Sequence, residues 1–140
     1  MEALIACRRT CRHYKDQQVD KDLIEKILRS VGNSPTGSCQ QLVEFTLIDD
    51  ISQMRRFKEL FYAELQEQFS KGIYPEQFPE PHFSKLMNKK WQDGIDIAFQ
   101  DAPHLVIVHA PVGRGEWITD VGIALAYLEL LLFTHGLGAI

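Results

Sequence analysis

The feature that most constrains the fold is an apolar stretch close to the C-terminal end, from Val121 to Phe133. Its apolar side chains surround a helix axis almost completely, which is typical of a helix buried on all sides. A chain of 140 residues has little mass to cover such a helix. We therefore expect a second copy of the chain to pack against it, with Leu128 at the contact. The stretch is shorter than the roughly 18 apolar residues of a membrane span and contains Glu129, so no membrane span is expected.

The composition predicts one globular domain over residues 1–140. The net charge of −4 argues against a nucleic-acid partner. Three cysteines without a CxxC pair support neither a disulfide scaffold nor a zinc site, so no metal is expected. Because no signal peptide precedes Arg8, we expect a cytoplasmic protein.

Periodicity and punctuation predict four helices and two strands. Asp20 and Ser52 are the expected N-caps of the first two helices. The run 105–108 is continuously apolar, which is typical of a central strand covered on both faces. The expected elements are helices at 20–31, 52–72, 85–99 and 118–133, and strands at 42–48 and 105–108.

Residues 73–83 contain three prolines, too many for a regular element, and are expected to form an ordered excursion or lid. The aromatic side chains of this segment either pack it against the rest of the protein or line a pocket. They are Tyr74, Phe78 and Phe83.

Two observations lead us to expect that a C-terminal segment is absent from the sequence given. A central strand needs neighbours, and only two strands are identifiable. The sequence also ends on apolar residues 137–140, directly after the helix stop expected at Gly136.

A basic cluster without any acidic residue lies ahead of the first long helix. It consists of Arg8, Arg9, Arg12, His13 and Lys15. Guanidinium groups bind phosphate oxygens through paired hydrogen bonds, and Thr10 adds a hydroxyl donor. The cluster therefore predicts a phosphate site, with a solvated basic turn as the alternative.

A second candidate is the small-residue loop 34–41 between a helix and a strand. Such a loop lets the backbone approach a flat ligand, and Thr36, Ser38 and Gln41 offer hydrogen bonds. A plain connector is the alternative.

Two acidic residues stand in the last helix. Asp120, in its first turn, is expected to complement the helix dipole. Glu129, among apolar residues, needs a partner either across a dimer or in a pocket. The sequence contains no Ser/His/Asp order, no HExxH and no phosphate loop of the GxxxxGK type, so hydrolase and nucleotide-triphosphatase activities lack support.

Taken in order, four stretches resemble the nitroreductase family of flavin-dependent oxidoreductases. One of these stretches, Asp-Ala-Pro at residues 101–103, precedes an apolar strand. Another departs from the family's pattern, because Cys39 stands where the family usually has Asn. The stretches are residues 8–12 (RRTCR), 34–41 (SPTGSCQQ), 101–103 (DAP) and 120–138, from DVGIAL to HGLG.

The resemblance implies an α+β fold, a three-layer sandwich with a central mixed sheet flanked by helices, and a homodimer through long helices. It further implies one FMN at each of two subunit interfaces, with some contacts made by the partner subunit. The implied FMN-binding residues are Arg8, Arg9, Thr10, Arg12, Pro35, Thr36, Ser38, Cys39 and Gln41.

The implied activity is a ping-pong transfer of reducing equivalents from NADH or NADPH through FMN to a small acceptor such as a nitroaromatic or a quinone. A ferredoxin-type donor is a further possibility for such proteins, and no side chain is assigned as a catalytic acid or base. The alternative from another class is a non-catalytic, dimeric flavin-binding or interaction protein of the same fold. A thiol or metal sensor using the three cysteines is a third hypothesis.

Overall fold

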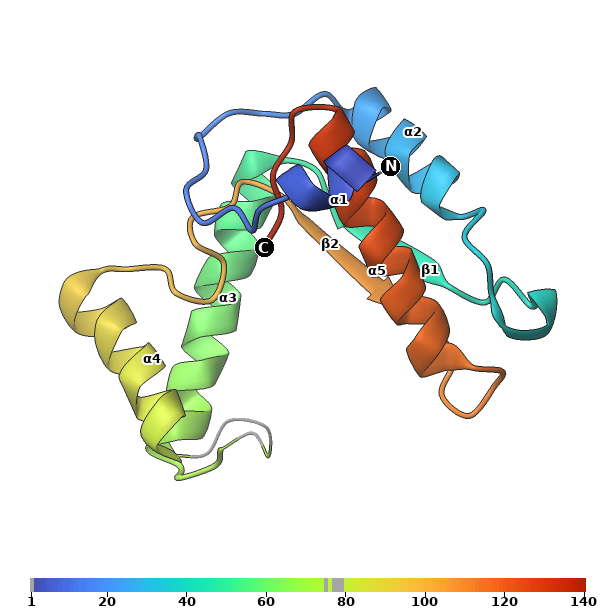
Figure 1. Ribbon diagram of the computed structural model, residues 1–140. Helices are drawn as coiled ribbons and strands as arrows, with labels where there is room; N and C mark the ends of the chain where they lie inside the picture. Colours follow the sequence, from blue (N-terminus) through green and yellow to red (C-terminus); the bar gives the residue numbers. More distant parts are fainter. Residues whose placement is uncertain (1, 75, 77–79) are drawn as a thin grey trace.

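The computed structural model describes residues 2–74, 76 and 80–140, and places a pair of strands against two helices (Figure 1). The elements in chain order are α1 (Glu2–Cys7), α2 (Lys21–Val31), a 3-10 turn η1 (Gly37–Cys39), β1 (Glu44–Ile48), α3 (Ile51–Ser70), α4 (Glu80–Asp93), β2 (Leu105–His109) and α5 (Trp117–Thr134).

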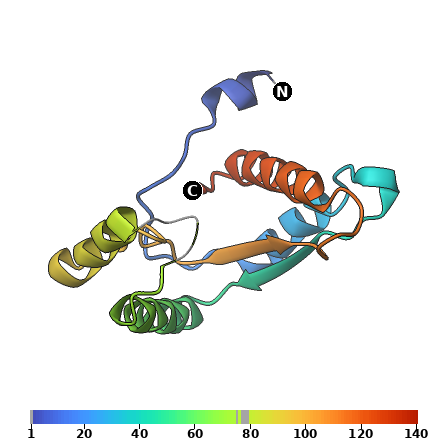
Figure 2. The ribbon, with the colours of Figure 1, turned by 90° about the horizontal axis from the view of Figure 1, so that it is seen from below.

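Helices α2 and α5 cover one face of the strand pair (Figures 1 and 2). The strands are antiparallel, with Glu44 opposite His109 and Ile48 opposite Leu105. Helix α2 begins at the predicted N-cap, where the Asp20 carboxylate accepts a hydrogen bond from the Asp22 amide at 3.0 Å. The core between the helices and the sheet is apolar and contains Ile27, Val31, Ala124 and Leu128, with Phe45, Val106 and Val108 packed against it.

The opposite face of the sheet is open in the described chain. Ile107 is 42% exposed there, and on the same face Thr46 and His109 lie 3.1 Å apart on neighbouring strands. The prediction that the run 105–108 is covered on both faces is therefore wrong for the chain by itself. The described strands also form an antiparallel pair rather than a mixed sheet.

Helix α5 is buried along one stripe only. Asp120, Ala124 and Leu128 form that stripe, one helical turn apart, whereas Ile118 and Leu125 remain 68% and 47% exposed. The expectation of a helix buried on all sides is thus wrong within one chain, and Leu128 lies in the chain's own core instead of at a free surface. With 18 residues α5 is long and apolar enough to cross a membrane. A single helix of this kind is weak evidence for a membrane span.

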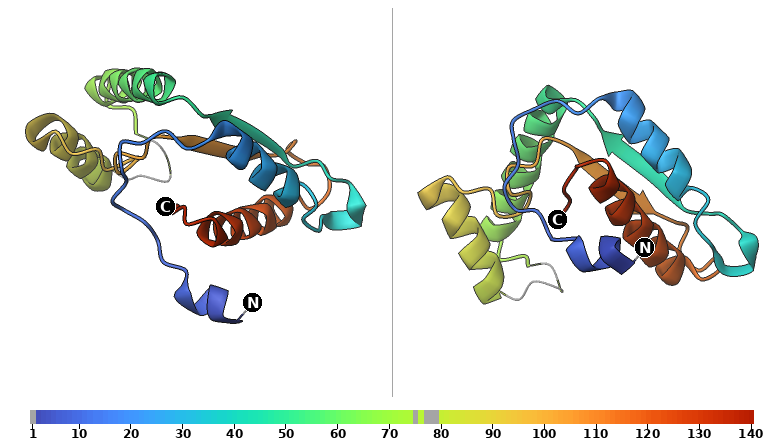
Figure 3. Two further views of the ribbon diagram at one scale, coloured as in Figure 1. Left: turned by 90° about the horizontal axis from the view of Figure 1, so that it is seen from above. Right: turned by 45° about the horizontal axis from the view of Figure 1, so that its top comes forward.

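Helices α3 and α4 lie side by side beyond the end of the sheet (Figures 1 and 3). The rings of Phe69 on α3 and Phe83 on α4 stack 5.9 Å apart. Helix α3 begins one residue after Asp50, whose carboxylate accepts from the Gln53 amide at 2.9 Å, so Asp50 and not Ser52 is the cap.

The helix expected at 85–99 begins and ends several residues earlier, at Glu80 and Asp93. Pro81 stands at the second position of α4, where a missing backbone N–H costs no hydrogen bond. The helix ends just before Gly94, which has a φ of +72°. Phe78 and two of the three prolines of the expected lid lie outside the described residues.

A buried carboxylate organises the turn that follows α4. Asp96 accepts hydrogen bonds from the Tyr62 hydroxyl at 2.5 Å and the Phe99 amide at 3.1 Å, and its other oxygen lies 3.0 Å from the Lys58 ammonium. Burial raises the pKa of Asp96, but these hydrogen bonds outweigh it and leave the pKa below its ordinary value. The network ties α3 to the chain just ahead of β2.

Candidate functional site

Arg8 is held on helix α5 by Glu129. Its Nη1 donates to Glu129 Oε1 at 2.7 Å, and both side chains are 35% exposed. Glu129 therefore finds its partner within the same chain. Among the residues that the structure describes, this is the one hydrogen bond of the Arg8 guanidinium, so its remaining N–H groups are available to a second anion.

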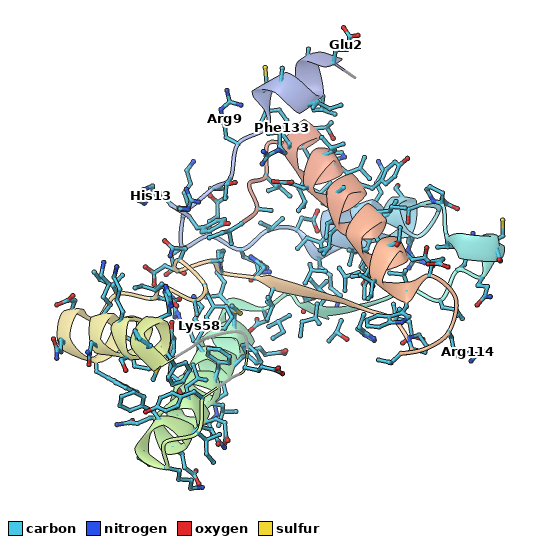
Figure 4. All side chains as sticks on the ribbon, turned by 60° about the horizontal axis from the view of Figure 1, so that its bottom comes forward. Glu2, Arg9, His13, Lys58, Arg114 and Phe133 are labelled. Atoms are coloured by element: carbon cyan, nitrogen blue, oxygen red, sulfur yellow. The ribbon has the colours of Figure 1, made fainter. Side chains whose placement is uncertain are left out.

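The other predicted phosphate-binding residues follow Arg8 along the surface. Arg9, Thr10 and Arg12 are exposed, and the Arg9 guanidinium donates to the carbonyl oxygens of Ala6 and Arg8 at 2.8 and 2.9 Å. Arg9 lies near the C-terminal end of α5, where Phe133 is labelled (Figure 4). The structure thus places Arg8 and Arg9 toward that end of the helix, with Thr10 and Arg12 following them in the chain.

The basic segment, residues 8–15, is fixed against the last residues of the chain. The Cys11 amide donates to the Ala139 carbonyl at 2.8 Å, and a Cβ on Gly138 would lie 2.5 Å from Cys11 Cβ. The Tyr14 hydroxyl donates to the Cys11 carbonyl at 3.1 Å. Burial and the neighbouring Cys11 raise the pKa of Tyr14 to about 12, so this donor stays protonated at neutral pH.

The second predicted part, loop 34–41, lies at the other end of α5. The Gly37 amide donates to Asp120 Oδ1 at 2.9 Å, and the Gln41 amide donates to Thr36 Oγ1 at 3.0 Å. A Cβ on Gly37 would meet the Glu116 side chain at 2.8 Å, so the loop lies close against the start of α5.

The same loop carries backbone strain. Ser38, Cys39 and Gln41 have φ values of +52°, +54° and +48°, in the left-handed region that side chains other than Gly, Asn and Asp seldom adopt. These three residues and Pro35 are exposed. Strained backbone of this kind concentrates at ligand-binding and active sites.

Within one chain the two predicted parts of the site do not meet. Arg8 binds α5 at Glu129, and Gly37 binds it at Asp120, nine residues earlier. At 1.5 Å of rise per residue the two anchor points are about 14 Å apart along the axis. Figure 4 labels Arg9 near one end of α5 and Arg114 near the other.

The donors at the two ends differ in chemistry. The basic segment offers fixed positive charge and a hydroxyl, which suit a phosphate group. The loop offers the side-chain amides of Gln40 and Gln41, the Ser38 hydroxyl and the Cys39 thiol, all on exposed residues, which suit the polar atoms of a flat ring. Over the described residues no group of three His, Cys, Asp or Glu side chains could hold a metal ion.

Sequence reasoning missed the contact between Asp120 and Gly37. A carboxylate in the first turn of a helix has an ordinary explanation in the helix dipole, so its bond to a loop 83 residues away leaves no local signal. The apolar residues that follow Asp120 do indicate a buried helix, and a buried carboxylate there implies some partner.

The nitroreductase family model matches residues 5–140. A similar solved structure is a BluB-like flavoprotein from Clostridium difficile 630, with 19% identity and a TM-score of 0.72 over 98% of this chain and 71% of that one. Another is an FMN-dependent nitroreductase from Clostridium difficile R20291, with 24% identity and a TM-score of 0.62 over 99% of this chain and 63% of that one. This chain therefore spans less than two thirds of the latter protein.

Two further similar structures differ in what they act on. An FMN- and NADPH-dependent nitroreductase from "sphigopyxis sp. strain HMH" is 22% identical, with a TM-score of 0.65 over 98% of this chain and 72% of that one. An iodotyrosine deiodinase bound to FMN and 3-iodo-L-tyrosine is 20% identical, with a TM-score of 0.66 over 99% of this chain and 72% of that one. No curated protein matches the chain with significant similarity.

Proposed function

We propose that this chain, which belongs to the nitroreductase family, is an FMN-dependent oxidoreductase. In this proposal it passes reducing equivalents from NAD(P)H to an electron-poor acceptor. The observation that carries the proposal is the family match over residues 5–140, within which the basic segment and the strained loop both lie. A nitroaromatic or a quinone is the proposed class of acceptor.

The residues of the basic segment fit the phosphate of FMN. Arg8 uses one N–H on Glu129, and Arg9 and Arg12 of the same segment are exposed. We assign the phosphate to Arg8, Arg9, Thr10 and Arg12, and the ring and ribityl chain to the loop. The assigned loop residues are Pro35, Thr36, Ser38, Cys39 and Gln41.

A homodimer through α5 is part of the proposal, in which the basic segment and the loop lie toward opposite ends of that helix, about 14 Å apart along its axis. Exposed Ile118 and Leu125 give α5 an apolar surface for a second copy. In that dimer the basic segment of one protomer and the loop of its partner would hold the same FMN. The three-layer sandwich belongs to the same proposal, since the open sheet face at Ile107 requires a further covering layer.

When bound, FMN supplies the two-electron chemistry between the nicotinamide donor and the acceptor. The chain's own residues bind and orient the cofactor, and none is assigned as an acid or base. Tyr74, which is 36% exposed, is proposed for the wall that meets the acceptor. Phe83 is 2% exposed and packs behind it, with the two ring centroids 5.9 Å apart. NADPH is supported as the electron donor by a similar nitroreductase that is NADPH-dependent. The experiment below distinguishes it from NADH and from a ferredoxin-type donor.

The test is an anaerobic titration of the FMN-loaded protein with NADH, with NADPH and with a reduced ferredoxin, followed by flavin absorbance. Bleaching by a nicotinamide donor and recovery on adding a nitroaromatic or a quinone support the proposal. Bound flavin that no donor bleaches would favour the alternative, a non-catalytic flavin-binding protein of this fold. The specific acceptor follows from a comparison of turnover among nitroaromatics, quinones and halogenated phenols.

A matched pair of variants tests the phosphate assignment. Arg8→Ala is expected to weaken FMN binding about tenfold or more, because a hydrogen bond to a charged group contributes about 1.5–3 kcal/mol. Arg56→Ala, an exposed arginine on α3, is the control and should leave FMN affinity unchanged. Equal affinity in both variants would contradict the assignment.

A further inference from the structure

Asp120 is a buried carboxylate whose hydrogen bond goes to a loop far away in the sequence. Its side chain is in the first turn of α5, the residue is 4% exposed, and Oδ1 accepts from the Gly37 amide at 2.9 Å. A buried carboxylate is costly unless it is hydrogen-bonded, so its presence needs a reason. Simple capping of α5 does not supply one, because the helix already begins at Trp117, three residues earlier.

The loop fixed by Asp120 has the strain described above. Ser38, Cys39 and Gln41 stand in the left-handed region directly after Gly37, and all three are exposed. Strained turns persist only where the surrounding structure holds them. Here the Asp120 bond holds the first residue of the turn, and the Thr36 hydroxyl, accepting from the Gln41 amide at 3.0 Å, holds the last.

Gly37 permits this contact because it has no side chain. A Cβ there would lie 2.8 Å from Glu116 Cγ and 2.9 Å from Glu116 Cβ. Only a glycine allows the loop to come close enough to the start of α5 for the hydrogen bond to Asp120.

We propose that Asp120 is a positioning residue which holds loop 37–41 in its strained shape, so that its exposed polar groups are presented to the flavin ring. This inference rests on the proposed function, in which the loop binds the ring and ribityl chain. It adds a role for Asp120, which touches no ligand itself and acts through the Gly37 amide. Because the loop would contact the ring and not the phosphate, Asp120 should affect FMN and riboflavin alike.

The experiment compares FMN and riboflavin affinities, measured by flavin fluorescence, in the full chain and in Asp120→Ala and Asp120→Asn. Asp120→Ala is expected to weaken both ligands about tenfold and to speed hydrogen exchange across residues 37–41. Asp120→Asn keeps an oxygen acceptor for the Gly37 amide and should recover most of the loss. Asp50→Ala is the matched control, since it removes another carboxylate-to-amide bond at the start of a helix far from the loop.

A second variant keeps the test informative if Asp120→Ala fails to fold. Gly37→Ala leaves the carboxylate intact and forces the loop away from Glu116, so it should weaken both flavins in the same way. Unchanged riboflavin affinity in a folded Asp120 or Gly37 variant would overturn the inference, as would a loss in Asp50→Ala equal to that in Asp120→Ala. If the unaltered chain binds FMN and riboflavin equally poorly, with no saturation, the proposed function itself fails and the inference fails with it.

Discussion

Glu129→Gln provides a sharp test of the phosphate site, because it removes the anion that holds Arg8. The Arg8–Glu129 pair has its nitrogen and oxygen 2.7 Å apart and both side chains 35% exposed. A phosphate approaching Arg8 must either displace this carboxylate or bind beside its negative charge. We therefore expect that Glu129→Gln tightens FMN binding.

The magnitude follows from the exposure of the pair. An ion pair open to solvent contributes about 0–1 kcal/mol. A change of 1.4 kcal/mol alters Kd tenfold, so releasing Arg8 tightens FMN by up to about fivefold. Riboflavin has no phosphate, and its affinity should stay constant.

The assay is a fluorescence titration with FMN and with riboflavin at low and high salt. Glu25→Gln, which breaks the exposed pair with Arg29, serves as the control. In an Arg8→Ala background the effect of Glu129→Gln should vanish, because the two changes act on one interaction. FMN affinity that falls in Glu129→Gln, or riboflavin affinity that rises with it, would refute the reasoning.

Three further outcomes are expected. Leu125→Asp places a charge on the exposed side of α5 and should turn a dimer into a folded monomer by light scattering, whereas Leu128→Asp should unfold the chain from within its core; a dimeric Leu125→Asp would contradict the proposed interface. Tyr62→Phe removes a hydrogen bond to Asp96 and should cost about 2 kcal/mol in urea unfolding; a loss near zero would show that the network is not stabilising. Burial lowers the pKa of His104 below 6.5, so the unfolded state binds more protons than the folded state. The free energy of unfolding should therefore fall as the pH drops below about 6.5. The same dependence of unfolding free energy on pH in His104→Gln would show that another group causes it.

The elements with strong local signals were predictable from the sequence. Helix α2 begins after Asp20 and ends before Gly32, and both strands fall within or close to the expected ranges. These signals are local, because an N-cap, a glycine stop or a β-branched run acts on its own neighbours. The early start of α4 at Glu80 was missed, because Pro81 resembles a break unless it is recognised as a residue of the first helical turn.

Contacts between distant parts of the chain were not predictable in the same way. The sequence indicated that Glu129 needs a partner, but the partner, Arg8, lies 121 residues away. The bond between Asp120 and Gly37 and the left-handed turn after it depend on how α5 meets the loop, which no periodicity records. Burial of α5 was overestimated because its apolar pattern does not distinguish the chain's own core from the face proposed for a second copy.

The most direct test of the FMN site is an equilibrium titration of the purified chain with FMN, with the oligomeric state measured on the same sample. The account predicts saturable binding of one FMN per chain in a homodimer, with a clear loss of affinity in Arg8→Ala and for riboflavin. A chain that binds no FMN, or binds it with the same affinity in Arg8→Ala, would contradict it.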